Sequence, residues 1–135
     1  PAAKTLVPYD ATQKVTLTYS DYSRLKVDGN TRVGRLLEQT LPFAFRAHHE
    51  HLGMEGIAIP EAVALVSVLH PRLFGRRSLS VDVETQGELT RGMTVFDRRR
   101  RAPRAANIDV ITDVDAQGVL DYLTRILGSS PQSVQ

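Results

Sequence analysis

The sequence contains no cysteine, which excludes a disulfide framework, a thiolate metal site and a cysteine nucleophile. It also lacks any apolar run of about 18 residues, so no membrane-spanning helix and no membrane partner are predicted. No basic segment followed by an apolar one marks a signal peptide. These absences fit a reducing compartment, and we expect a cytoplasmic protein.

The sequence also has little excess charge of either sign, because it contains 17 basic and 15 acidic residues and its formal net charge is only +2. Fourteen of the basic residues are arginine, which stays charged to very high pH and raises the isoelectric point to about 9.3. So small an excess gives little support to nucleic-acid binding, and we expect no nucleic-acid partner. The 135 residues, of which 41% are hydrophobic, suffice for one domain with a core.

The local patterns predict an irregular mixture of strands and helices. Apolar alternation marks strands, and apolar residues recurring with a period near 3.6 mark helices. Thr18 or Ser20 can cap a first helix, and Thr31 can cap a second, longer one. This order of elements indicates an α/β or α+β layer pattern. The predicted elements are short or weak strands at 5–7 and 15–18, helices at 21–25, 31–53 and 61–69, a hairpin of strands at 79–85 and 90–96, a strand at 108–114, and a helix at 116–127.

The two central helices carry most of the apolar residues. Pro42 lies inside the first of them and is expected to kink it or divide it in two. Pro60 opens the second, which is apolar nearly all round and is therefore expected to be deeply buried. So few strands cannot cover it, which suggests that something else does. The apolar face expected on the first helix consists of Val33, Leu36, Leu37, Leu41, Ala44, Phe45 and Leu52.

Three histidines, His48, His49 and His51, cluster near the end of the first central helix. Imidazole binds metals, but no two of the three are spaced by four residues, so a zinc site is disfavoured. His48 and His49 lie three and four residues after Phe45 and share its face of the helix. They are either substrate contacts or members of a solvated or capping cluster.

Two charged features also admit two interpretations. Glu61 is either a first-turn carboxylate stabilised by the helix dipole or a carboxylate held at the mouth of a site. The arginine run 98–101, with Arg104 close by, either binds phosphate or nucleic acid or is a solvated exit from the hairpin.

Three segments, read together, resemble the inosine–uridine-preferring nucleoside hydrolases. Residues 7–15 are similar to the family's V-P-L-D-V-T-x-K stretch, and residues 53–64 to its G-x-x-G-x-x-L-H-D-P-x-A segment. Residues 81–99 are similar to its V-x-V-E-x-x-G-x-x-T-R-G-x-T-V-x-D hairpin, which is the longest and most specific match. The segments occur in the family's order and extend over nearly the whole chain.

The resemblance implies an α/β fold: the C-terminal part of an open, mostly parallel sheet flanked by helices, with a β-hairpin near the C-terminal end. Residues 1–135 would then be the C-terminal portion of a single domain. The family's N-terminal D-x-D-x-x-x-D-D cluster, which binds calcium and activates water, is not in this sequence. The resemblance therefore implies calcium as cofactor, the N-terminal half of the same protein as partner, a nucleoside substrate, and a homo-oligomer (dimer or tetramer).

The family's H-D pair falls on Pro60 and Glu61 of this chain. The resemblance thus implies that Glu61 is a metal ligand, whereas Pro60 cannot protonate a leaving base as the family's histidine does. His48 or His49 is expected to take over as catalytic acid and, with Phe45, to contact the substrate. The implied activity is hydrolysis of the N-glycosidic bond of purine or pyrimidine ribonucleosides or a related N-ribosyl compound. The alternative is a non-catalytic binding or structural relative that has lost the leaving-group acid.

Overall fold

The computed structural model describes residues 3–128, which form a four-stranded sheet, a two-stranded sheet and helices. The larger sheet is mixed: the strand nearest the N-terminus pairs parallel with its neighbour, and the remaining two pairs of neighbouring strands are antiparallel. In the smaller sheet the two strands are antiparallel. The strand order of the larger sheet is β1 (Thr5–Leu6), β6 (Ile108–Val114), β4 (Phe74–Val83), β5 (Thr94–Asp97), and the smaller sheet joins β2 (Thr16–Thr18) to β3 (Gly56–Ala58).

The α/β class is confirmed, but the expectation of a mostly parallel sheet is wrong for the part of the chain that the structure describes. Parallel neighbours need a long crossover connection, usually a helix. Strands β4, β5 and β6 follow one another with no helix between them, so they pair antiparallel. The result is an open mixed sheet whose single parallel pair joins residues far apart in the chain, with Thr5 opposite Asp109.

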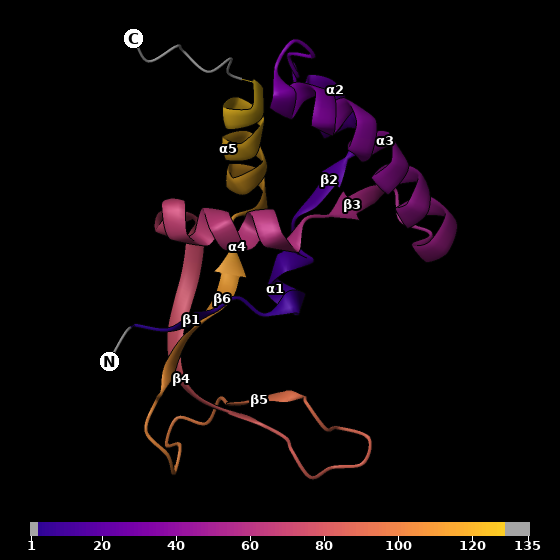
Figure 1. Cartoon of the computed structure of the whole chain (residues 1–135). Coiled ribbons are helices and arrows are strands. Elements are labelled where there is room, and N and C mark those ends of the chain that lie inside the picture. The colour runs from indigo at the N-terminus through magenta and orange to yellow at the C-terminus, as the bar shows by residue number, and fades with distance from the viewer. Residues whose placement is uncertain (1–2, 129–135) are drawn as a thin grey trace.

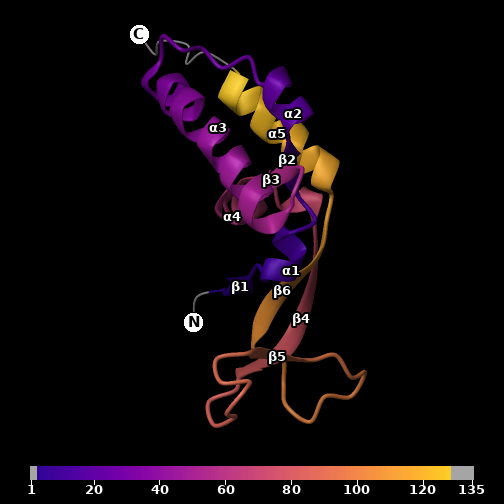
Figure 2. The same ribbon diagram turned by 90° about the vertical axis from the view of Figure 1, so that its right-hand side faces the viewer.

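The helices gather at one end of the molecule, and β4 and β6 run from them to the β4–β5 hairpin at the other end (Figures 1 and 2). Within residues 3–128, none of the helices has the length and hydropathy that a bilayer crossing requires. The helices are α1 (Tyr9–Thr12), α2 (Tyr19–Arg24), α3 (Arg32–Leu52), α4 (Pro60–Leu69) and α5 (Ala116–Gly128), and a short 3₁₀ turn covers Pro71–Leu73.

The helix ends follow local sequence signals. The Thr18 hydroxyl accepts a hydrogen bond from the Asp21 N–H at 3.1 Å, and the Asp21 carboxylate accepts from the Thr18 N–H at 3.0 Å, forming a capping box at α2. The Thr31 hydroxyl likewise accepts from the Gly34 N–H at 2.9 Å. Gly53 ends α3 with a φ of 63°, in the left-handed region that glycine adopts without strain. The predicted caps at Thr18 and Thr31 are confirmed.

Helix α3 runs through Pro42 undivided, so of the two outcomes expected there, a kink or a division, the division is wrong. Proline removes only one hydrogen bond of the helix, the one its missing N–H would make. The next turn is held by packing, because Phe45 belongs to the buried core and Leu41 and Ala44 pack against it. Tertiary contacts therefore offset the local cost of the proline.

Helix α4 is buried on one face only, which corrects the expectation that it is deeply buried all round. Val63 and Val66 are 0% and 1% exposed, but Leu65 and Val68 on the other face are 60% and 75% exposed. Helix α3 behaves similarly: Val33, Leu36 and Leu52 were expected on its buried face and are exposed. Within residues 3–128 no element covers these apolar positions.

The second strand of the hairpin is shorter than the strand at 90–96 that the apolar alternation predicted. Residues 84–93 form a closed turn, in which the Glu84 N–H donates to the Met93 carbonyl at 3.0 Å and the Gly92 N–H to the Glu84 carbonyl at 2.7 Å. Gly92 has a φ of 87°, which favours glycine. Strand β5 therefore begins at Thr94 rather than at residue 90.

Candidate functional site

The start of α4 presents a free carboxylate. Pro60 is the first residue of the helix, and the proline ring suits the first turn, where no intrahelical N–H donor is needed. Glu61 follows it and is exposed, and its carboxylate makes no hydrogen bond or ion pair with any other residue in the described part of the chain. Its charge lies at the positive end of the helix dipole, which stabilises it there. The carboxylate is therefore available to an external cation.

A complete metal site is not present among residues 3–128. They contain no group of three or more histidine, cysteine, aspartate or glutamate side chains arranged to hold a metal ion. Calcium takes six to eight oxygen ligands in proteins. Glu61 can supply one or two of these oxygens, so any calcium bound at α4 needs further donors from elsewhere.

His48 is oriented by its own helix. Its ring atom Nδ1 lies 3.0 Å from the Ala44 carbonyl oxygen. A carbonyl only accepts hydrogen bonds, so Nδ1 carries the hydrogen and donates it. In the neutral ring Nε2 is then an acceptor, and it becomes a donor only when the ring is protonated. The side chain is half-buried.

His49 occupies a different environment, although it is adjacent in sequence. Its Nδ1 lies 3.5 Å from a carboxylate oxygen of Glu55, and its side chain is 65% exposed. His51 is also exposed. Strand β3 separates this end of α3 from α4 (Figure 1), and in residues 3–128 no hydrogen bond or ion pair joins His48 or His49 to Glu61.

Phe45 lies in an aromatic cluster that joins α2 to α3. Its ring centre is 5.3 Å from that of Tyr19 and 5.7 Å from that of Tyr22. Phe45 is 9% exposed, whereas Tyr19 is 62% exposed, so Tyr19 presents the accessible ring of the cluster. No sequence pattern predicts the role of Tyr19, because its proximity to Phe45 depends on how α2 packs against α3.

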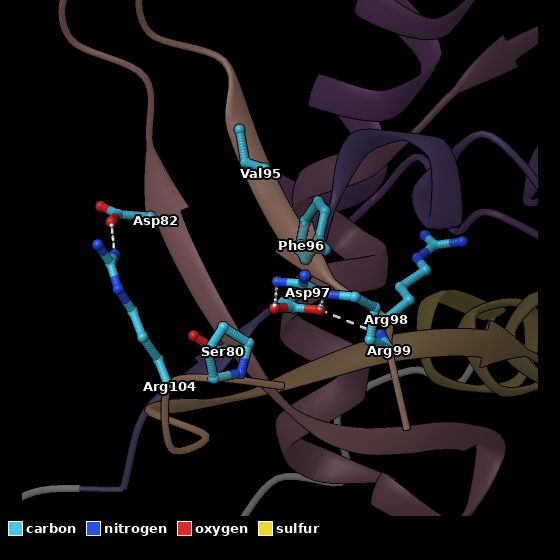
Figure 3. A pocket seen from close by; sticks show the side chains of 9 residues that line it. Ser80, Asp82, Val95, Phe96, Asp97, Arg98, Arg99 and Arg104 are labelled. Atoms are coloured by element: carbon cyan, nitrogen blue, oxygen red, sulfur yellow. Dashed lines mark hydrogen bonds and ion pairs between the residues drawn. The ribbon is translucent and has the colours of Figure 1, made fainter. Parts of the chain in front are cut away.

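A pocket lies at the hairpin end of the molecule, away from the helices (Figure 1). This pocket, of about 750 Å³, is lined by β4, β5 and the arginine-rich loop that follows β5. Figure 3 shows that each of its two carboxylates faces a guanidinium group: Arg99 donates to Asp97 at 2.9 and 2.6 Å, and Arg104 donates to Asp82 at 2.5 Å. The Arg98 guanidinium lies 6.0 Å from the centre of the Phe96 ring.

These contacts keep both carboxyl groups ionised. The hydrogen bonds from Arg99 lower the pKa of Asp97 to about 2. The Val83 N–H, followed by Arg104, lowers the pKa of Asp82. Asp97 and Arg99 are only two residues apart, so their pairing could be expected from the sequence. Asp82 and Arg104 meet only because the loop folds back along β4 (Figure 3).

The sequence and the fold relate the chain to known proteins. Residues 1–121 match the family model described as inosine-uridine preferring nucleoside hydrolase. The chain belongs to this family. The prediction made from the three sequence segments is thus confirmed.

Curated relatives of this chain include two pyrimidine-specific ribonucleoside hydrolases named RihA. The protein from Salmonella newport (strain SL254) is 34% identical over 119 residues, which are 87% of this chain and 38% of that protein. The protein from Shewanella sp. (strain ANA-3) is 31% identical over 124 residues, 91% of this chain and 39% of that protein. The chain therefore spans less than half the length of these relatives.

Solved structures agree with this family assignment. The purine-preferring ribonucleoside hydrolase from Gardnerella vaginalis superposes with a TM-score of 0.77 at 26% identity, over 94% of this chain and 40% of that one. A plant nucleoside hydrolase superposes with a TM-score of 0.79 at 22% identity, over 96% of this chain and 42% of that one, and shows the shared fold.

Proposed function

We propose that this chain is the C-terminal portion of a calcium-dependent nucleoside N-ribohydrolase, which cleaves the N-glycosidic bond of ribonucleosides or a related N-ribosyl compound. The observation that carries this proposal is the family match over residues 1–121. Since the chain spans 38% of the length of a curated relative, we propose that an N-terminal half completes the domain and that the whole protein forms a homo-oligomer.

Glu61 would supply this chain's ligand to calcium. It takes the place of the family's aspartate and is exposed and free of other partners in residues 3–128. Calcium accepts carboxylates with flexible geometry, which accommodates a side chain one methylene longer. When bound, the ion would stabilise charge at the ribose and at the attacking water. The other ligands would come from the aspartate cluster of the N-terminal half.

His48 would donate the proton that the leaving base needs. The contact between its Nδ1 and the Ala44 carbonyl fixes the ring, so that the protonated form presents its proton at Nε2. A positioned general acid contributes about 10²–10⁴-fold to a rate. His49 is the second candidate. Phe45 would contribute to base binding through the exposed ring of Tyr19, which packs against it.

The calcium-ligand role of Glu61 is tested by calorimetric titration of calcium into the complete protein. Replacing Glu61 by Ala should weaken calcium binding by about tenfold or more, because a charged ligand is lost. Glu50→Ala is the matched control: this exposed glutamate lies on α3, and its loss should leave calcium affinity unchanged. Unchanged affinity in Glu61→Ala would return Glu61 to the role of a first-turn charge.

The alternative is a relative that binds ribosyl compounds but does not hydrolyse them. Its specific support is Pro60, which stands where the family has a histidine and cannot transfer a proton. Calcium binding without turnover of inosine or uridine in the complete protein would favour this alternative over the hydrolase.

A further inference from the structure

The loop after β5 and the neighbouring strand β4 enclose a groove of about 390 Å³ that is rich in arginine. It adjoins the pocket of Figure 3 and shares Ser80, Asp97, Arg99 and Arg104 with it. The charged side chains that line it are Arg77, Arg99, Arg100, Arg104 and a single acid, Asp97. The lining is therefore net positive, with four arginines against one aspartate, while Asp82 and Asp109 lie beside it and accept hydrogen bonds from Arg104 and Ser78.

Two of the four guanidinium groups are held in place by carboxylates. Asp97 accepts from both Nε and Nη2 of Arg99, and Asp82 accepts from Arg104. An arginine fork that is already oriented loses less conformational freedom when it binds a second anion. Exposed ion pairs contribute little to stability. An anion that competes with Asp82 or Asp97 for these arginines would therefore lose little free energy by weakening the pairs.

The other two guanidinium groups have their full hydrogen-bonding capacity available. The guanidinium groups of Arg77 and Arg100 make no hydrogen bond or ion pair with any of residues 3–128, although the Arg77 backbone pairs with Val110 in the sheet. Arg77 lies on β4 and Arg100 on the loop, and both residues line this groove. Arg77 also lines a neighbouring pocket, together with Asp10 and Lys14. Guanidinium groups recognise phosphate oxygens through paired N–H donors.

We propose that this groove binds a small anion bearing a phosphate group, such as inorganic phosphate or the phosphate of a nucleotide. The volume lies in the range of small-molecule sites, roughly 300–1,000 Å³. Single-stranded nucleic acid fits less well, because such sites combine positive charge with free aromatic faces for stacking. The aromatic ring nearest the groove, Phe96, already carries the guanidinium of Arg98.

The test uses adjacent arginines as a matched pair. Arg100 lines the groove, whereas Arg101 is next to it in the same exposed loop and is not part of the groove lining. Inorganic phosphate and uridine 5′-monophosphate are titrated separately, by calorimetry, into the complete wild-type protein and into Arg77→Gln, Arg100→Gln and Arg101→Gln. Circular dichroism should show all variants folded, because the three side chains are exposed.

We expect phosphate to bind the wild type and to bind Arg77→Gln and Arg100→Gln about tenfold more weakly, with Arg101→Gln within about twofold of wild type. A free phosphate site would bind both probes equally, and a nucleotide site would bind the monophosphate more tightly. No phosphate binding to the wild type would overturn the proposal. Equal losses in Arg100→Gln and Arg101→Gln, with tight binding of a single-stranded oligonucleotide, would also overturn it in favour of a nucleic-acid surface. Uridine turnover should be unchanged in the arginine variants, so this proposal can fail without the hydrolase proposal failing.

Discussion

The two ends of the molecule differ in how their exposed carboxylates are paired. At the start of α4, Glu61 has no partner in the described residues, and Leu65 and Val68 on the same helix are exposed. In the hairpin pocket, by contrast, the carboxylates of Asp82 and Asp97 each have an arginine partner. The hairpin pocket therefore pairs its own carboxylates, whereas the α4 end leaves Glu61 for a further segment to use, and both ends expose apolar side chains, with Leu89 of the hairpin 98% exposed.

The largest expected effect is on folding itself. Expressed alone, residues 1–135 should aggregate or remain molten, because large apolar side chains on α3 and α4 stay in water, Phe43 and Val68 at 70% and 75% exposure among them. Calorimetry and near-ultraviolet circular dichroism should show no cooperative transition, and co-expression with the N-terminal half should restore one. A sharp melt of the isolated monomer would mean that α4 needs no cover.

The second effect is on turnover and concerns the leaving group. In the complete protein, His48→Ala should slow inosine and uridine hydrolysis about 10²-fold or more, because the departing base loses its proton donor. The same variant should hydrolyse p-nitrophenyl riboside nearly as fast as wild type, because that leaving group needs no proton. Wild type should itself prefer p-nitrophenyl riboside.

His49→Ala separates the second candidate from the first, because His49 is exposed and lies against Glu55 whereas His48 is half-buried. It should affect both substrates little. If natural nucleosides are cleaved at full rate and neither histidine matters, another residue is the acid.

The third effect is on stability and compares two valines with a core residue. In the complete protein Ile111→Ala, at a position 1% exposed, should lower the free energy of unfolding by about 2–5 kcal/mol. Val68→Ala should cost more than the ~0.5 kcal/mol typical of exposed sites, because the N-terminal half that we propose would cover this residue. Val83→Ala, on the hairpin and 50% exposed here, should stay within ~0.5 kcal/mol. Chemical denaturation measures all three, and equal small effects at Val68 and Val83 would show that α4 stays uncovered.

The smallest effect concerns pH and belongs to the hairpin. The pKa of Asp97 is lowered from 3.8 to about 2 by Arg99, so its ionised form stabilises the folded state above the unfolded pKa. This contribution is lost as the pH falls from about 4 to about 2. Asp97→Asn should therefore melt slightly below wild type at pH 7, and the difference should vanish near pH 2. A difference that persists at pH 2 would point to packing rather than charge.

Local signals in the sequence determined the parts of the fold that depend on a few neighbouring residues. Thr18 and Thr31 predicted helix starts because a threonine hydroxyl caps backbone N–H groups within three residues. Pro60 predicted the start of α4 because the first turn of a helix does not need the N–H that proline lacks. The alternation at 108–114 predicted β6 with its observed limits. The family, too, could be identified from sequence, because its motifs are contiguous.

Only the tertiary structure decided which sides of these elements are covered and which distant groups meet. The pairing of Thr5 with Asp109 and of Asp82 with Arg104 joins residues from separate segments, and no local pattern encodes either contact. The same holds for α4: its apolar residues mark a helix that favours burial, but which of them pack depends on the surfaces supplied by other elements. Val66 is buried and Val68 exposed on that one helix, because burial is a property of contacts between elements rather than of the residue type.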